Sequence, residues 1–278
     1  MITDAQTNLV YFSKLIAEKF PNSWKSIASI LDKHGIKHRF LEGTKDIWCR
    51  DYMPIQTDSN TFVQFRYEAP YLNQEPELRT IPAEALQAND FKPSFADIIL
   101  DGGNIVRSSD KVIITKRVFK DNPTITNNDL INALEQHLHA KVLIIPDITT
   151  DETGHADGHI RFINDKTVLV NELANEFKYW QQGFRKMIQQ SGLSFIEMPW
   201  FEPKLKNEPI SALGIYVNYL EIGNLIIFPI FQIPGNKDQQ ALNTITKAFP
   251  NKIIEPIYIN EISLKGGLMN CISWNIRN

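Results

Sequence analysis

The chain has 278 residues, of which 43% are hydrophobic, a composition that is ordinary for a globular protein with a substantial buried core. It contains 29 Lys and Arg and 32 Asp and Glu, which gives a formal charge of −3. This charge argues against nucleic acid or an anionic membrane surface as a partner. The first residues lack a signal-like pattern and no later run approaches the roughly 20 apolar residues of a membrane helix, so we expect a cytoplasmic protein.

The N-terminal part of the chain predicts partial units of an α/β fold. A helix is expected from about Ser23 to His34, and strands are expected at Lys37–Leu41 and Thr61–Tyr67. Glu68–Pro93 is rich in Pro, Glu and Asn, which is typical of a long excursion. This excursion is either decoration or a lid over a site, because long loops in compact domains are often functional.

The next segment predicts a hairpin, a helix and a strand. Asp97–Leu100 and Lys111–Thr115 are short β-branched runs on either side of glycines and a polar turn, which favours a hairpin between them. A helix follows, with its cap near Thr126 or Asn127, and its apolar stripe consists of Leu130, Ile131, Leu134 and Leu138. Lys141–Ile145 then predicts a buried strand.

This order of elements returns twice. The second unit has strands at Ile160–Phe162 and Thr167–Val170, a helix from about Asn175 to Ser191 and a strand at Ser194–Met198. The third has strands at Ile215–Tyr219 and Leu225–Phe228, a helix from about Lys237 to Ala248 and a strand at Ile253–Ile257. A period of roughly 55 to 60 residues indicates radial or linear repetition, and we favour a ring of ββαβ units. A doubly wound sheet competes, but no Gly-rich phosphate loop opens these helices.

Two acidic residues stand next to residues that break regular structure. Asp51 lies in the segment Trp48–Pro54, and it is either a site residue or half of a surface ion pair with its neighbour Arg50. Asp101 precedes two glycines, which permit an unusual bend or a close approach of the backbone. Asp101 alone also fits an ordinary turn carboxylate.

The densest polar cluster is Asp151–His159. If its second half is extended, His155, Asp157 and His159 share one face, because side chains of a strand alternate. Three interpretations stay open at this point: a metal site, a polar strand end, or acid–base work by His155 with Asp157 orienting it or binding a cation.

Two cysteines stand far apart in the chain and form neither a disulfide framework nor a paired metal motif. A lone cysteine is more often a small buried residue than a nucleophile, and we expect this of Cys49. Cys271 follows two glycines and precedes an apolar stretch, which places it at the mouth of a strand. A reactive thiol there needs a positive partner, which His155 or a cationic substrate would supply.

These segments, in this order, resemble the agmatine deiminases and the bacterial, Porphyromonas-type peptidylarginine deiminases of the pentein guanidine-modifying superfamily. The resembling pieces are Trp48–Pro54, Leu100–Asn104, Asp151–Phe162, Tyr216–Tyr219, Ile226–Pro229 and Gly266–Ser273. The resemblance implies a five-bladed ββαβ propeller with pseudo-fivefold repeats around a central active site, formed by one catalytic domain over residues 1–278. It implies no cofactor and no metal.

The resemblance also assigns roles. It places the catalytic nucleophile on Cys271, the acid–base residue on His155 and the guanidinium-binding carboxylates on Asp51 and Asp157. Asp101 would orient the histidine or bind the edge of the guanidinium. Further substrate contacts are expected from Trp48, Asn218 and Arg161, although Arg161 also fits a structural ion pair.

The implied reaction is the conversion of agmatine, or another small guanidine, to the ureido product and ammonia, which for agmatine is N-carbamoylputrescine. Deimination of arginine or peptidyl-arginine, dihydrolysis, amidinotransfer and non-catalytic guanidine binding stay open as alternatives, as does a homo-oligomer. The chain departs from the family at Asp101, where relatives usually carry Glu, at Asn270, where they usually carry His, and at Gly158–His159.

Overall fold

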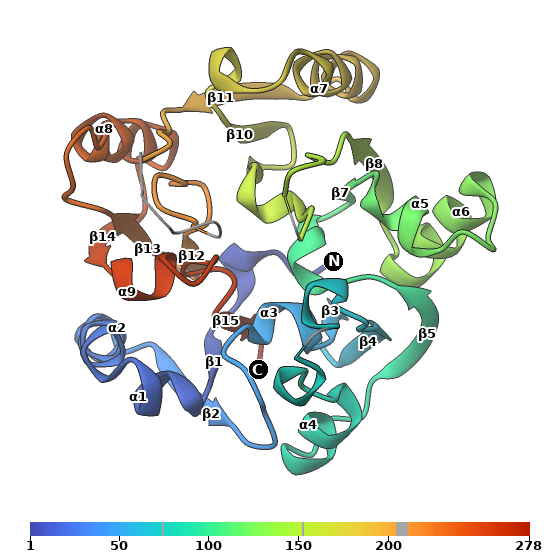
Figure 1. The fold of residues 1–278 in the computed structure, drawn as a ribbon, viewed down its shortest axis with the longest axis horizontal. Coiled ribbons are helices and arrows are strands. Elements are labelled where there is room, and N and C mark those ends of the chain that lie inside the picture. Colours follow the sequence, from blue (N-terminus) through green and yellow to red (C-terminus); the bar gives the residue numbers. More distant parts are fainter. Residues whose placement is uncertain (74, 152, 204–210) are drawn as a thin grey trace.

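The computed structural model describes residues 1–73, 75–151, 153–203 and 211–278, and its strands form five three-stranded sheets around a common centre (Figure 1). In every sheet the middle strand pairs antiparallel with the strand nearest the centre. It pairs parallel with the outer strand, to which it is connected through a helix. The expected ring of five ββαβ units is therefore confirmed.

The first sheet joins the two ends of the chain. It consists of β15 (Ser273–Ile276), β1 (Leu9–Ser13) and β2 (Lys37–Leu41). The next two are β3 (Ile55–Asp58), β4 (Thr61–Arg66) and β5 (Ser94–Ile99), then β6 (Val106–Arg107), β7 (Lys111–Thr115) and β8 (Lys141–Ile145). The last two are β9 (Ile160–Asn164), β10 (Thr167–Asn171) and β11 (Ser194–Met198), then β12 (Leu220–Ile222), β13 (Leu225–Ile230) and β14 (Ile253–Tyr258).

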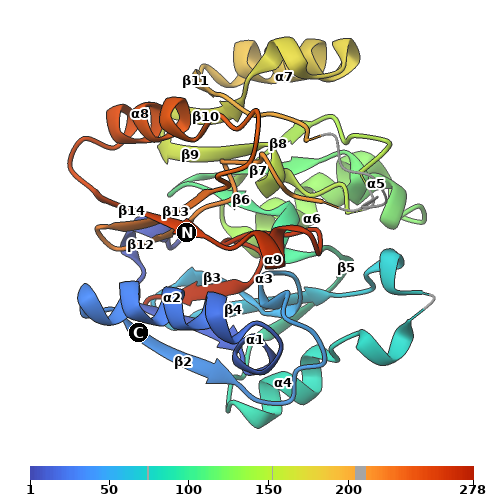
Figure 2. The same ribbon diagram turned by 60° about the vertical axis from the view of Figure 1, so that its left-hand side comes forward.

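One longer helix per unit lies on the outside of the strands (Figures 1 and 2). These helices are α2 (Pro21–Lys33), α4 (Pro82–Ala88), α6 (Asn127–Leu138), α7 (Lys178–Ser191) and α8 (Asp238–Ala248). Short helices are α1 (Leu15–Lys19), α3 (Cys49–Tyr52), α5 (Arg117–Asp121) and α9 (Asn260–Ser263), with 3-10 turns η1 (Asp4–Gln6), η2 (Pro70–Leu72), η3 (Pro76–Leu78), η4 (Gly102–Asn104), η5 (Ala156–Gly158) and η6 (Leu173–Asn175). In the described ranges, no helix combines the length and apolarity needed to cross a bilayer.

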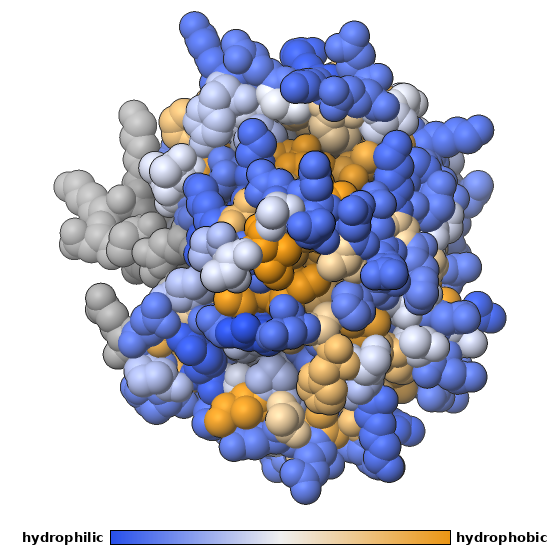
Figure 3. Space-filling view, turned by 90° about the vertical axis from the view of Figure 1, so that its right-hand side faces the viewer, coloured by the Kyte–Doolittle hydropathy of each residue, from blue (hydrophilic) through white to orange (hydrophobic). Residues whose placement is uncertain are grey.

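Helix α6 shows how the sequence specifies these outer helices. The hydroxyl of Thr126 accepts a hydrogen bond from the backbone N–H of Asp129, which satisfies one of the free donors at the helix start. The apolar stripe on its inner face, Leu130, Leu134 and Leu138, is fully buried against β7 and β8. Burial of each leucine contributes about 2 kcal/mol. The face of the molecule on this side carries many hydrophilic residues, with apolar residues visible between them (Figure 3).

Two sequence predictions about strands were wrong. Asp97–Leu100 does not pair with Lys111–Thr115, because most of that run belongs to β5, which pairs parallel with β4, whereas β7 forms its hairpin with β6. Ile215–Tyr219 is not a strand, since the strand begins only at Leu220. Residues 215–219 have the apolar and aromatic composition of a strand because this segment packs in the core. Tyr216 is fully buried there, and its hydroxyl donates to Oδ1 of Asp238 at 2.7 Å.

The excursion Glu68–Pro93 is partly regular. It contains α4, the outer helix of the second unit, so this part of the segment completes a ββαβ repeat. Gln74 lies outside the described residues, as does Glu152 in the polar cluster. Leu72, Glu75 and Leu78, which precede α4, line the cavity that holds the candidate site.

Candidate active site

Each of the five units contributes to one site from the segment that precedes its innermost strand. In chain order, the residues are Asp51 before β3, Asp101 before β6, His155 and Asp157 before β9, Asn218 before β12 and Cys271 before β15. Because the innermost strands surround one centre, these segments meet there (Figure 1). All of these residues except Asp101 line a cavity of about 660 Å³, and Asp101 contacts His155.

Cys271 is half-buried at the cavity wall, at the predicted mouth of a strand. Its Sγ lies 3.2 Å from Nδ2 of Asn218 and 3.7 Å from Oδ2 of Asp157. Burial, together with the charges of Asp157 and Asp51, raises the pKa of the thiol well above its usual range. The ligand-free thiol is therefore protonated near neutral pH. A cation bound between these carboxylates would offset their charge and lower the pKa of the thiol.

The second cysteine, Cys49, lies outside the cavity lining. Cys49 is fully buried, and its thiol donates to the backbone oxygen of Ile272 at 2.9 Å. Burial raises the pKa of this thiol as well. Cys49 is absent from the lining of the cavity, which agrees with a structural role.

His155 lies between two carboxylates. Its Nε2 is 3.0 Å from Oδ2 of Asp101, and its Nδ1 is 3.6 Å from Oδ1 of Asp51. Burial alone would lower the pKa of His155, but Asp51, Asp101 and Asp157 outweigh it and raise this pKa to about 10. The imidazole is therefore a cation at neutral pH and is equipped to donate a proton.

The segment around His155 differs from the extended strand that the sequence predicted. Residues 156–158 form the 3-10 turn η5, so the alternation of a strand does not apply to them. His155 and Asp157 nevertheless both line the cavity. His159 lines it too, but its ring forms ion pairs with Asp151 at 3.6 Å and Glu176 at 3.9 Å. Across the described ranges, no three His, Cys, Asp or Glu side chains are placed to hold a metal ion together.

Asp51 is positioned by a close approach of the chain at Gly103. The N–H of Gly103 donates to Oδ1 of Asp51 at 3.0 Å. A Cβ atom at this glycine would lie 2.6 Å from that oxygen and 2.6 Å from Nδ1 of His155, so only glycine fits. Burial and the nearby Asp101 and Asp157 raise the pKa of Asp51 to about 7, although His155 opposes this effect.

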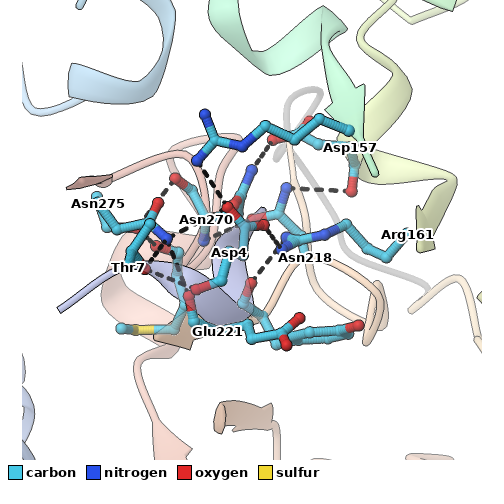
Figure 4. A network of polar contacts seen from close by, with 12 residues as sticks. Asp4, Thr7, Asp157, Arg161, Asn218, Glu221, Asn270 and Asn275 are labelled. Carbon is cyan, nitrogen blue, oxygen red and sulfur yellow. Dashed lines mark hydrogen bonds and ion pairs between the residues drawn. The ribbon is translucent and has the colours of Figure 1, made fainter. Parts of the chain in front are cut away.

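Asn270 is a site residue that the sequence did not single out as one. Its Nδ2 donates to Oδ2 of Asp157 at 2.6 Å, and Asn218 accepts a hydrogen bond from its backbone N–H at 3.1 Å (Figure 4). Asn218 also donates to the backbone oxygen of Asp157 at 3.4 Å. The two asparagines thus connect the segments that carry Asp157 and Cys271. The available signal was the position of Asn270 directly before Cys271.

Arg161 lies away from the cavity lining. Its Nη2 donates to Oδ2 of Asp4 at 2.6 Å, and its Nη1 donates to the backbone oxygen of Tyr219 at 2.9 Å (Figure 4). Arg107 and Asn275 also donate to Asp4, so this half-buried carboxylate connects three units at the centre of the ring. The expected substrate contact is replaced by the structural ion pair.

Trp48 forms part of the cavity wall, as expected of a substrate-contacting residue. Its ring packs so tightly against Gly267 that a Cβ atom there would lie 2.3 Å from Cζ3 of the indole. Further apolar lining comes from Phe20, Ile215 and Leu268. The cavity therefore combines an apolar wall with a charged floor, as small-ligand sites commonly do.

A family model described as Porphyromonas-type peptidyl-arginine deiminase matches residues 13–276. The chain belongs to this family. Among curated proteins, this chain is 26% identical over 214 residues to a Marinomonas sp. protein named "Putative agmatine deiminase". The aligned residues cover 65% of this chain and 57% of that protein. A Listeria monocytogenes protein of similar name is 25% identical, over 67% of this chain and 57% of that protein. The chain thus matches less than two thirds of the length of these relatives.

Solved structures of other members share the fold. The C. jejuni agmatine deiminase with substrate bound has a TM-score of 0.81 at 16% identity, with 100% of this chain and 96% of that chain covered. The agmatine deiminase of Enterococcus faecalis has a TM-score of 0.75 at 17% identity, with 99% and 94% covered. These likenesses establish the family's architecture for this chain.

Proposed function

We propose that this chain is a guanidine-modifying hydrolase, a deiminase whose Cys271 attacks the central carbon of agmatine or of another small guanidine. The observation that carries this proposal is the gathering of a thiol, an imidazole and two buried carboxylates at one cavity. A planar guanidinium presents five N–H donors, which the carboxylates of Asp51 and Asp157 would accept in fork geometry. Oδ2 of Asp157 lies 3.7 Å from the sulfur of Cys271, and Asp51 lines the same cavity.

The chemistry follows from these positions in two steps. The thiolate of Cys271 adds to the guanidinium carbon, a C–N bond breaks, and His155 donates its proton to the departing ammonia. The product of this step is a thiouronium on Cys271. Neutral His155 then takes a proton from water, the water oxygen adds to the same carbon, and the C–S bond breaks. The net reaction converts a guanidinium and water to a ureido compound and ammonium.

Substrate binding would also favour the thiolate, and the proton of the thiol would pass to solvent. The carboxylates that raise the pKa of the Cys271 thiol are the groups that a guanidinium would neutralise. The positive charge of the substrate would then lie next to the sulfur and stabilise its anion. The family membership and the names of the curated relatives support this chemistry, and agmatine is the substrate class that those names indicate.

A product assay tests the proposal. Wild-type protein is incubated with agmatine, arginine, methylated arginines and an arginyl peptide, and the ureido product, ammonia and amine are measured. We expect one ureido group and one ammonia per turnover of at least one substrate, and loss of both in Cys271→Ala. Two ammonia molecules would indicate dihydrolysis, and a released amine would indicate amidinotransfer. Thermal stabilisation by a guanidine without any product would instead indicate a binding protein.

A further inference from the structure

The cavity has an acidic floor and a basic rim. The floor carries Asp51 and Asp157, which are 6% and 2% exposed. The rim carries three lysines: Lys19 and Lys265 are exposed, and Lys45 is half-buried. A ligand that fills the cavity would therefore meet charges of opposite sign at its two ends.

The three ammonium groups are available to a ligand. With the described residues, Lys19, Lys45 and Lys265 form no ion pair and no side-chain hydrogen bond. Lys237, in contrast, pairs with Glu172 at 2.9 Å. The three lysines come from different segments, namely the end of α1, the loop after β2 and the loop after α9. None of the three positive charges of the rim is therefore held in an ion pair with a described residue.

The acidic residues near the rim are mostly engaged. Asp46 accepts from the N–H of Trp48 at 2.7 Å and from the hydroxyl of Thr80 at 2.9 Å. Asp151 accepts from the N–H of Thr153 at 3.0 Å, and it also faces His159. Within the described lining, Glu75 is the one acidic residue that is exposed. Within the described lining, the three lysines without an ion pair therefore outnumber the one exposed acidic residue.

The segments that carry Lys45 and Lys265 contact each other, and Lys19 lines the same cavity. Lys265 stands two residues before Gly267, which packs against Trp48 in the segment that carries Lys45.

We propose that the substrate is a guanidine whose far end carries a carboxylate, which the rim of Lys19, Lys45 and Lys265 binds. This inference rests on the proposed function, and it narrows the substrate class to guanidino acids of the arginine kind. The acidic floor attracts the guanidinium, and the basic rim attracts the carboxylate. Agmatine carries an ammonium group at that end, so the same rim would repel it.

A matched set of ligands tests this inference by binding. Guanidinopentanoate, pentylguanidine and agmatine have the same methylene spacer and end in a carboxylate, a methyl and an ammonium group. Their affinities for Cys271→Ser protein are measured by calorimetry. We expect guanidinopentanoate to bind about tenfold more tightly than agmatine at low salt, with a smaller ratio at high salt, because salt screens exposed charges. Equal or tighter binding of agmatine would overturn the inference.

Charge reversal gives the second test. Lys45→Glu and Lys265→Glu should each weaken guanidinopentanoate binding by about tenfold, strengthen agmatine binding and leave pentylguanidine nearly unchanged. The control is Lys186→Glu, since Lys186 is exposed on α7 and outside the cavity lining. Rim variants that behave like this control would contradict the inference. Turnover by wild-type protein is measured separately. If none of the three guanidines gives a product, this result counts against the proposed deiminase chemistry. The order of the three affinities still decides whether the rim binds a carboxylate.

Discussion

Nε2 of His155 lies 3.0 Å from Oδ2 of Asp101, a residue of the neighbouring unit of the ring. This contact joins the residue that precedes η5 to the residue that precedes η4, and it fixes one nitrogen of the imidazole while the other faces Asp51. The carboxylates raise the pKa of His155 to about 10 against the opposing effect of burial. In the proposed reaction, this imidazole would donate its proton to the departing ammonia.

Asp101→Asn should therefore change the pH profile of the proposed deimination. Loss of this charge lowers the pKa of His155, so the alkaline limb of kcat should move to lower pH, with activity at pH 9 reduced about tenfold or more. Asp97→Asn is the control, because Asp97 is an exposed carboxylate on β5 that pairs with Arg66. An unchanged alkaline limb in Asp101→Asn would show that this carboxylate does not set the protonation of His155.

Alkylation of Cys271 should report the raised pKa of its thiol. In ligand-free protein, the iodoacetamide rate at Cys271 should stay low near neutral pH and rise only under alkaline conditions, because the thiolate is disfavoured. Asp157→Asn removes one cause and should increase the rate at pH 8 about tenfold. Peptide mass spectrometry separates this reaction from that of buried Cys49, which should not react before unfolding. Equal rates in the two proteins would contradict the assigned role of Asp157.

The fold was largely predictable because each ββαβ repeat has a local pattern. The predicted strands at Lys37–Leu41, Lys141–Ile145 and Ser194–Met198 coincide with β2, β8 and β11, since each is a short run bounded by turn residues. The closure of the ring by β1 and β15 was not predicted. That pairing joins Leu9 to Ile276, and no local pattern reports a contact between the two ends of a chain.

The site was predictable in its residue types and less so in its contacts. Asp51, His155, Asp157 and Cys271 are found by their neighbours in the sequence, and they meet at the cavity. The direction of Arg161 depends on Asp4, which is distant in the sequence, so its motif could not distinguish substrate contact from an ion pair.

Asn270 should matter for guanidinium binding, because it donates to the carboxylate oxygen of Asp157 nearest the thiol. Asn270→Ala removes a hydrogen bond to a charged group, which contributes about 2 kcal/mol, or about 30-fold in kcat/KM. Asn270→Asp should be more damaging, since it places a like charge beside Asp157. Steady-state kinetics of both variants check this prediction. The control is Asn243→Ala, because Asn243 is exposed on α8. A fall in stability without a change in kcat/KM would limit Asn270 to a structural role.

Asp4 should be essential for stability. Asp4→Ala leaves the buried guanidinium groups of Arg107 and Arg161 without their shared anion, and we expect a loss of about 3–5 kcal/mol in the free energy of unfolding. The exposed control Asp58→Ala should change it by less than about 0.5 kcal/mol. Urea unfolding measures both values. A loss for Asp4→Ala no larger than that of the control would contradict this role.

The pH dependence of that loss has a defined sign. Burial opposes ionisation of Asp4, but Arg107 and Arg161 outweigh it, so the pKa of Asp4 lies below its usual range. A depressed carboxylate pKa stabilises the folded state fully above the unfolded pKa of about 3.9, and this contribution is lost as pH falls towards the folded pKa. The gap between wild-type and Asp4→Ala protein should therefore be constant near neutral pH and narrow below about pH 4.

The nucleophilic role of Cys271 is tested most directly by trapping its covalent intermediate. Wild-type protein turning over its best guanidine is quenched in acid, digested and analysed by mass spectrometry. We expect the peptide that contains Cys271 to gain the mass of the substrate minus ammonia, and Cys271→Ser to lose both this adduct and about 10³-fold or more of the activity. Ureido product formed at the wild-type rate by Cys271→Ser, without an adduct, would contradict the account.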